Sequence, residues 1–269
     1  MARRAGAAGG GGPLGVEGGD TGRAAAAGRA AGAGRASARE CRARPDGSAG
    51  VTDTQNRAVK VDIWSDIACP WCFIGKRKFE DAVARYGGPV EVEYHSFELS
   101  PDTPVDFEGD EVKFLADHKG MPADQVRGML DNVTGIAAEV GLQYDFGKLR
   151  HTNTVKAHEL LHFAKANGLQ REMKERLLAA YFEEGRHLGR IDELVDLATE
   201  VGLDADAARA ALDDGRFEPD VRADQAQAQA FGITGVPFFV LEGKYGISGA
   251  QAPEMFLQAL QQVGAEVSA

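Results

Sequence analysis

The fold is decided by the stretch Val59-Lys60-Val61-Asp62-Ile63-Trp64-Ser65-Asp66-Ile67-Ala68-Cys69-Pro70-Trp71-Cys72-Phe73-Ile74. Its first residues alternate aliphatic side chains with Lys60, Asp62 and Trp64, which is the pattern of a half-buried β-strand. Two cysteines separated by two residues follow. Beyond them the apolar residues take the spacing of an amphipathic helix, and Gly87-Gly88 ends it. The stretch therefore predicts a strand, a cysteine pair and a helix.

The rest of the chain alternates between strand and helix patterns. A second strand is expected at residues 90–94. Between about residue 101 and residue 230 nearly every periodic segment is helical, with breaks near Met121-Pro122 and at five glycines. Strand patterns return at 237–241 and 245–248, and a last helix is expected at 252–263. The predicted class is α/β: one layer from residues 58–100 and 231–269, interrupted by an inserted all-helical subdomain at 101–230.

The first 57 residues form a low-complexity tail. Residues 1–58 hold 14 of the 34 glycines and few side chains that could form a core, so we expect the tail to be disordered. Its scattered arginines leave a nucleic-acid-binding arm as a less favoured alternative. We also expect residues 1–50 to be dispensable, with Val51 as a candidate start of translation.

Charge and hydropathy limit the partners of the remaining chain. The first 58 residues carry nine arginines against five acids, so the net charge of −11 for the whole chain leaves −15 for the rest. Such an acidic domain repels phosphate backbones and anionic membranes, so we expect no nucleic-acid or membrane partner. No apolar run approaches the roughly 20 residues that span a bilayer. We therefore expect a cytoplasmic location.

The cysteine pair, Cys69 and Cys72, can form a disulfide or bind a metal. Structural zinc needs four ligands, and the only other cysteine is Cys41 in the tail. His158 and His162, four residues apart on an expected helix, make a two-ligand site conceivable, but such histidines are more often hydrogen-bonded or solvated. We therefore expect no metal.

The position of the cysteine pair favours redox chemistry. Cys69 falls between a strand and the start of a helix, where free backbone N–H groups and the helix dipole stabilise a thiolate. Pro70 suits the first helical turn, and Cys72 is carried into the helix. The sequence predicts Cys69 as the attacking thiolate and Cys72 as the resolving thiol.

Four segments resemble the DsbA family of the thioredoxin superfamily, specifically its FrnE-like cytoplasmic branch. They are the active-site motif at 66–75, the loop Phe231–Phe239, the motif Ser248-Gly249-Ala250-Gln251, and Asn153-Thr154 with Ala157-His158 in the insert. The resemblance covers residues 58–263 and implies a thioredoxin-like domain with a helical insert. It implies a protein disulfide oxidoreductase with a redox-active Cys69–Cys72 disulfide and no bound cofactor.

The resemblance also implies roles for residues around the cysteines. Val236–Pro237 is expected to be a cis peptide beside Cys69, with the Val236 backbone hydrogen-bonding a substrate, while Pro70 and Trp71 belong to the substrate-binding rim. Some members of the branch carry further cysteines near the C-terminus, which this chain lacks. The expected partner is a protein or small molecule with a thiol or disulfide, with glutathione as a candidate co-substrate.

Two alternatives remain open. Similar proteins include glutathione-dependent transferases and 2-hydroxychromene-2-carboxylate isomerases, which have a serine at the position of Cys69, so an isomerase or transferase acting on a small aromatic compound is the second hypothesis. A non-enzymatic peptide-binding module with a vestigial disulfide is the third. Because the insert must bury its apolar faces, we expect it to pack over the active-site face as a lid.

Overall fold

The computed structural model describes residues 57–267, and the quoted stretch folds as its pattern predicts. The chain forms β1 (Val59–Ser65), α1 (Pro70–Tyr86) and β2 (Val90–Ser96) before the helical region, and β3 (Phe238–Leu241), β4 (Tyr245–Ser248) and α9 (Pro253–Val267) after it. Gly87 caps α1 in the left-handed conformation, with φ 69°. The predicted end of this helix is therefore confirmed.

The strands form one mixed sheet in the order β2-β1-β3-β4. β1 pairs in parallel with β2, so that Ile63 faces Tyr94, and antiparallel with β3, so that Ile63 also faces Phe239. A parallel pair needs a crossover connection, and α1 supplies it. The sheet thus joins segments from both ends of the described chain.

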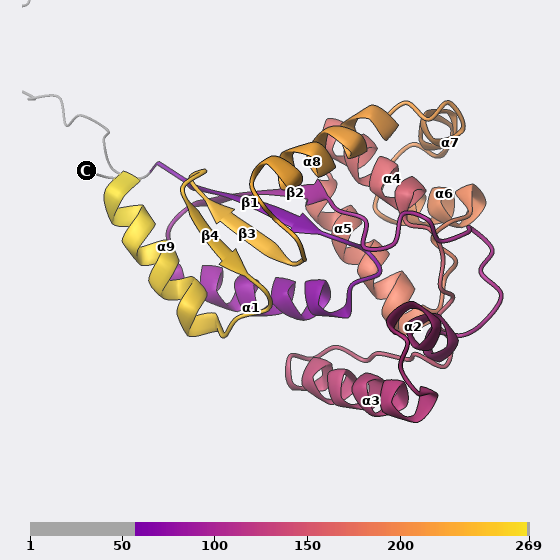
Figure 1. The fold of residues 1–269 in the computed structure, drawn as a ribbon. Coiled ribbons are helices and arrows are strands. Elements are labelled where there is room, and N and C mark those ends of the chain that lie inside the picture. Colours follow the sequence, from indigo (N-terminus) through magenta and orange to yellow (C-terminus); the bar gives the residue numbers. More distant parts are fainter. Residues whose placement is uncertain (1–56, 268–269) are drawn as a thin grey trace, which may run out of the picture. The chain divides into compact units, whose positions relative to one another are not determined.

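The alternation along β1 divides its side chains between two faces of the sheet. Val59, Val61 and Ile63 pack with α1 and α9, while Trp64 packs on the other face with Ala228 and other apolar residues. Figure 1 shows α1 and α9 along one side of the strands and α8 along the other. The cysteine pair therefore follows a strand that is fixed on both faces.

The region between β2 and β3 is helical, as predicted. Its elements are α2 (Glu111–Lys119), α3 (Ala123–Glu139), α4 (Val155–Ala166), α5 (Gln170–Ala179), the π-helical turn η1 (Ala180–Glu184), α6 (Ile191–Glu200), α7 (Ala205–Asp213) and α8 (Glu218–Ala230). The expected breaks fall between these helices. We call residues 101–230 the helical insert.

The helical insert shares a hydrophobic core with the segment that carries the cysteine pair. Ile67, Phe73 and Ile74, which flank or follow the cysteine pair, pack in one cluster with insert residues such as Leu160 and Leu177. The predicted division into segments 58–100, 101–230 and 231–269 therefore stays a prediction about chain organisation. The tail prediction falls on residues 1–56, outside the described part.

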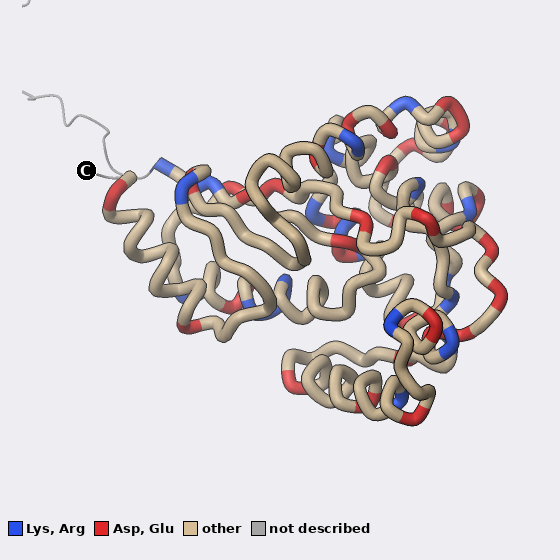
Figure 2. Tube along the Cα trace, viewed as in Figure 1, with Lys and Arg blue, Asp and Glu red and all other residues tan. Residues whose placement is uncertain are grey.

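Charged residues are spread over the described elements. Figure 2 shows acidic and basic positions interspersed along the helices and loops, without a continuous basic tract in residues 57–267. Within the same range, no helix combines the length and apolar character needed to cross a membrane.

Candidate active site

The cysteine pair lies at the N-terminus of α1. Cys69 is the N-cap residue, in an extended conformation (φ −93°, ψ 112°), and Pro70 is the first residue of the helix. The backbone N–H of Cys72 donates to the carbonyl oxygen of Cys69 at 3.0 Å. Both cysteines are free thiols with side chains in the core, and their residues are 4% and 3% exposed. The predicted location at a strand-to-helix junction is confirmed.

The loop before β3 closes over Cys69. The Val236–Pro237 peptide bond is cis, and the Cys69 thiol donates to the Val236 carbonyl oxygen at 3.6 Å. Gly75 of α1 allows this approach, because a Cβ atom there would lie 3.0 Å from Cγ of Pro237. The expectation of a cis bond beside Cys69 is confirmed.

A pocket of about 420 Å³ opens next to Cys69. Pro70, Trp71 and Val236 line it from the α/β layer. The helical insert supplies the opposite wall, from α2 and α3, through Phe114, Leu115, Met129, Leu130 and Val133. The insert thus lies at the active-site face as expected, and Trp71 stands 40% exposed at the pocket. Cys72 is not part of the lining, so a ligand in this pocket meets Cys69 first.

A buried acid precedes the cysteine pair. Asp66 is 1% exposed, and its carboxylate accepts hydrogen bonds from the N–H of Leu99 at 2.7 Å and of Ala68 at 3.3 Å. His158 of α4 lies 3.2 Å from the same carboxylate through Nε2. Burial alone would raise the pKa of Asp66, but the contacts with His158 and Leu99 lower it below its ordinary value. A negative charge therefore lies near the two sulfurs.

The two thiols share their ionisation. The hydrogen bond between them, followed by burial, raises the pKa of Cys69 well above its ordinary value. Burial also acts to raise the pKa of Cys72, but its hydrogen bond with Cys69 and the charge of Lys174 lower it. When one proton is shared between two adjacent sulfurs, the first ionisation belongs to the pair.

The sequence-based prediction of Cys69 as the attacking thiolate stays a prediction. In the singly ionised pair the hydrogen bond between the two sulfurs favours the remaining proton on Cys69, because it raises the pKa of Cys69 and lowers that of Cys72. Access from the pocket favours Cys69 as the attacking sulfur, since Cys69 lines the pocket. Transfer of the shared proton from Cys69 to Cys72 would place the thiolate on Cys69, where a substrate can reach it.

Three residues of the helical insert near the cysteines were not predicted as site residues. The hydroxyl of Tyr144 donates to the carbonyl oxygen of Pro70 at 2.7 Å, His158 contacts Asp66, and Lys174 is completely buried. For Lys174 a signal existed: it interrupts the apolar face that α5 presents through Met173, Leu177 and Leu178. A lysine on an apolar helix face needs a buried partner.

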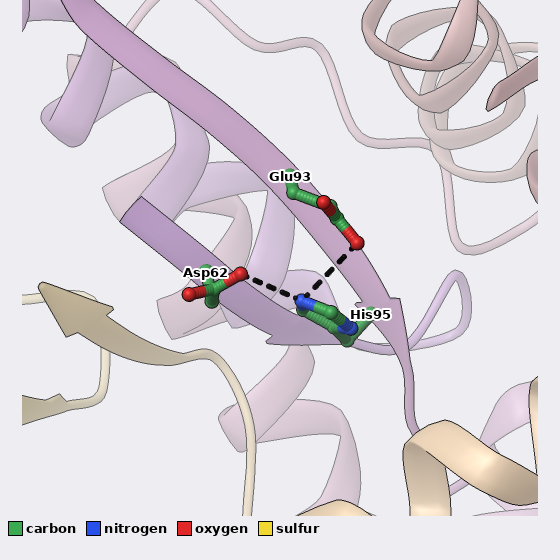
Figure 3. A group of neighbouring side chains, drawn as sticks. All are labelled: Asp62, Glu93 and His95. Carbon is green, nitrogen blue, oxygen red and sulfur yellow. Dashed lines mark hydrogen bonds and ion pairs between the residues drawn. The ribbon is translucent and has the colours of Figure 1, made fainter. Parts of the chain in front are cut away.

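A separate polar cluster occupies the face of the sheet opposite α1. His95 on β2 lies between two carboxylates, with Nε2 2.9 Å from Asp62 and Nδ1 2.8 Å from Asp224 of α8. Figure 3 shows Asp62, Glu93 and His95 converging, as metal ligands would. Because carboxylates engage both ring nitrogens, this arrangement is typical of a buried imidazolium rather than of a ligand.

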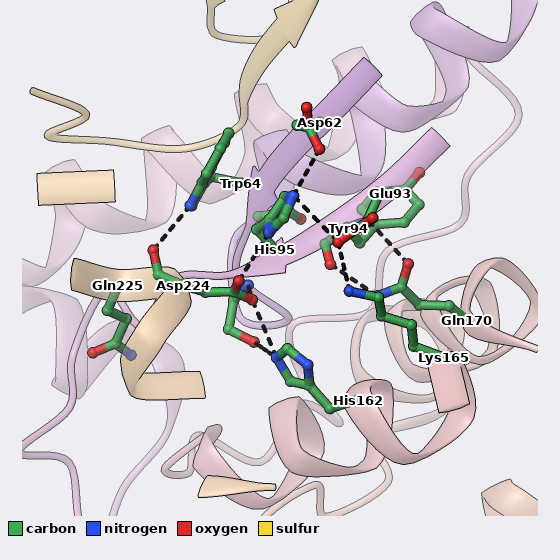
Figure 4. A network of polar contacts seen from close by, with 12 residues as sticks. Asp62, Trp64, Glu93, Tyr94, His95, His162, Lys165, Gln170, Asp224 and Gln225 are labelled. Atoms are coloured by element: carbon green, nitrogen blue, oxygen red, sulfur yellow. Dashed lines mark hydrogen bonds and ion pairs between the residues drawn. The ribbon is translucent and has the colours of Figure 1, made fainter. Parts of the chain in front are cut away.

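The same cluster accounts for His162. Its Nε2 atom lies 3.1 Å from Asp224 and 3.0 Å from the Ser96 hydroxyl, as Figure 4 shows for His162 and Asp224. His158 instead contacts Asp66. His158 and His162, considered above as ligands of one metal ion, therefore contact different carboxylates.

The comparisons with known proteins agree with this geometry. The DSBA-like thioredoxin domain family matches residues 60–261. The uncharacterized protein YwbO of Bacillus subtilis (strain 168) is 34% identical over 206 residues, which cover 75% of this chain and 96% of that protein. The crystal structure of a probable DsbA oxidoreductase from Streptomyces coelicolor is 42% identical, with a TM-score of 0.73, and the match covers 77% of this chain and 91% of that one.

More distant structures share the fold. The cytosolic disulfide reductase DsbM from Pseudomonas aeruginosa, solved with GSH, is 22% identical with a TM-score of 0.53, over 77% of this chain and 96% of that one. The expected class, a thioredoxin-like domain with a helical insert, is confirmed. The chain belongs to the DSBA-like thioredoxin domain family, as its cysteine motif and cis-proline loop indicated.

Proposed function

We propose that the protein exchanges disulfides through Cys69 and Cys72, with Cys69 as the attacking sulfur. The observation that carries this proposal is the placement of the pair: Cys69 lines a pocket beside the cis peptide at Val236, while Cys72 lies behind it in α1. Family membership supports a thiol–disulfide oxidoreductase as the general activity.

The exchange proceeds in two steps. The Cys69 thiolate attacks one sulfur of a substrate disulfide, which forms a mixed disulfide and releases the other sulfur as a thiolate. The Cys72 thiolate then attacks Cys69, which forms the Cys69–Cys72 disulfide and releases the substrate's second sulfur. Two electrons pass from the cysteine pair to the substrate, and the reverse sequence oxidises a substrate dithiol.

The proposal extends to partners and location. The substrate is a protein or small molecule with a thiol or disulfide, and Pro70, Trp71 and Val236 border the pocket that would receive it. Glutathione is a candidate co-substrate and the cytoplasm the proposed compartment, since the fold neighbour DsbM is a cytosolic reductase solved with GSH. No bound cofactor is required by this chemistry.

A trapping experiment tests the function. The Cys72→Ser variant is expected to accumulate mixed disulfides through Cys69, because the second attack is lost. Non-reducing gels of cell lysate should show adducts that dithiothreitol releases. Cys69→Ser should form none and should lose exchange with a dithiol buffer. Both variants carry Cys41→Ser, so that the tail thiol does not contribute adducts.

The isomerase hypothesis predicts a different result. The apolar pocket beside Cys69 supports the isomerase hypothesis, since a small aromatic compound can bind there. An isomerase exchanges no sulfur bond with itself, so neither variant would trap a partner, and Cys69→Ser could retain turnover. If Cys72→Ser forms no adduct and the wild-type protein does not equilibrate with glutathione, the redox proposal is overturned.

A further inference from the structure

We propose that Lys174, carried by the helical insert, is a positioning residue whose buried ammonium group stabilises the ionised form of the cysteine pair. The inference rests on the proposed function and adds a role to the insert. According to this inference the helical insert lines the pocket and also places a positive charge behind the cysteine pair. Helix α5 is anchored to both β2 and α1, and Lys174 forms no ion pair with a carboxylate among residues 57–267.

Helix α5 is anchored to the sheet one turn before Lys174. The side chain of Gln170 accepts a hydrogen bond from the N–H of Tyr94 at 3.0 Å and donates to the carbonyl oxygen of Tyr94 at 2.8 Å. Figure 4 shows Gln170 against Tyr94 on β2. Residues four apart lie on the same face of a helix, so Lys174 is directed toward the sheet as well.

The next residue fastens α5 to α1. Glu175 pairs with Lys76 at 2.5 Å and also with Arg77, and both partners lie just beyond Cys72 in α1. Lys174 is therefore held between an anchor on β2 and an anchor on α1. Its Nζ atom reaches the Ser65 carbonyl oxygen, at the end of the strand that leads into the cysteine loop.

The ammonium group of Lys174 is poorly compensated. Lys174 is 0% exposed, its hydrogen bond to Ser65 is long at 3.4 Å, and its Nζ atom lies 5.6 Å from the ring centre of Tyr94. Lys174 makes no ion pair with any carboxylate among residues 57–267. An unpaired buried ammonium is strongly destabilising, so a functional counter-ion is expected nearby.

The acidic groups that face Lys174 are the two thiols and Asp66. Burial lowers the pKa of Lys174 to about 8, against the charges of Cys72, Asp66 and Cys69, which raise it, while Lys76 lowers it. Asp66 already has partners in Leu99, Ala68 and His158. Lys174 lowers the pKa of Asp66 and also that of Cys72, and of these two groups only Asp66 has a histidine partner. The thiolate that forms during exchange is therefore the group that depends most on Lys174.

The test replaces the ammonium group and measures the ionisation of the thiols. In the full chain with Cys41→Ser, Lys174→Met should raise by about one unit the pH at which the thiolate absorbance of the reduced protein appears, because the ammonium charge is lost. It should also shift the equilibrium with a glutathione buffer toward the disulfide, by up to about tenfold at a pH where the wild-type pair is ionised, because only the reduced form loses stabilisation. Lys156→Met is the matched control, since this insert lysine donates to the Leu212 carbonyl oxygen and pairs with Glu159, and it does not contribute to the pKa shifts of the two thiols.

Further readouts separate this role from a structural one. Lys174→Met should leave the oxidised protein at least as resistant to urea, because an apolar side chain replaces an unpaired buried charge. If Lys174→Met does not fold, Lys174→Gln provides the second test: its amide can still donate to the Ser65 carbonyl oxygen but carries no charge, so the thiolate titration should shift to higher pH in the same way.

Two outcomes would overturn the inference. One is an unchanged thiolate titration in Lys174→Met while disulfide exchange continues, and the other is an equal change in Lys156→Met. Failure of the proposed function is a separate result, since it would appear as an absence of adducts in Cys72→Ser whatever the residue at 174.

Discussion

Replacing Asp224 by alanine is expected to lower the free energy of unfolding by about 3–5 kcal/mol, the range for removing one partner of a buried ion pair. The Asp224 carboxylate lies 2.7 Å from the N–H of Ser96, 2.8 Å from Nδ1 of His95 and 3.1 Å from Nε2 of His162. Asp224 belongs to α8, His95 to β2 and His162 to α4. The substitution therefore leaves three donors without this acceptor, of which Ser96 and His162 are buried, and removes a contact that joins three elements.

Urea denaturation of the wild-type protein and of Asp224→Ala measures the loss of unfolding free energy. Asp220→Ala is the matched control, because Asp220 lies one turn earlier in α8 and is exposed. It should change stability by less than about 1 kcal/mol. Equal midpoints for Asp224→Ala and Asp220→Ala would show that the cluster contributes nothing specific.

The layer around the cysteines was predictable because its signals are local. The alternation of Val59, Val61 and Ile63 and the position of Cys69 before a helix can be read from adjacent residues. The cis bond at Val236–Pro237 came from the family resemblance, since no local pattern requires it. These features place Cys69 at the start of α1 and the cis peptide at Val236–Pro237, as the structure has them.

The charges that control the site were not predictable in the same way. Lys174 and Ser65 are 109 residues apart, and His95 and Asp224 are 129 residues apart. Such pairs form only when the insert packs on the sheet, so neither residue carries a signal of its partner. The helix N-terminus beside Cys69 is visible in the sequence, and Lys174 interrupts an apolar helix face, but neither signal shows that Lys174 acts on the pKa of Cys72. The role of Cys69 as the attacking thiolate stays a prediction.

The stability of the protein is expected to fall between pH 6.5 and 9 because of His95. Burial alone would lower the pKa of His95, but the hydrogen bonds with Asp224 and Asp62 raise it from 6.5 to about 9. A histidine with a raised pKa in the folded state stabilises fully below its unfolded pKa, and this stabilisation is lost as pH rises through the folded value. Since one pKa unit corresponds to about 1.4 kcal/mol, the loss is on the order of 3 kcal/mol.

Lys174 acts in the opposite direction in part of this range. Burial lowers the pKa of Lys174 to about 8, so unfolding takes up a proton above this pH and stability rises there. The slope due to His95 is therefore clearest between about pH 6.5 and 8. A comparison of variants, rather than the profile of one protein, isolates it.

The decisive measurement is the difference in urea stability between the wild-type protein and His95→Gln as a function of pH. The variant should be less stable by on the order of 3 kcal/mol at pH 6, and the two curves should converge as pH approaches 9, because neutral His95 and glutamine both lack the charge that faces Asp62 and Asp224. Substitution of the exposed His118 by glutamine should leave the profile unchanged. A difference between wild type and His95→Gln that stays constant from pH 6 to pH 9 would mean that His95 packs as a neutral ring, and the ion-pair interpretation of the cluster would fail.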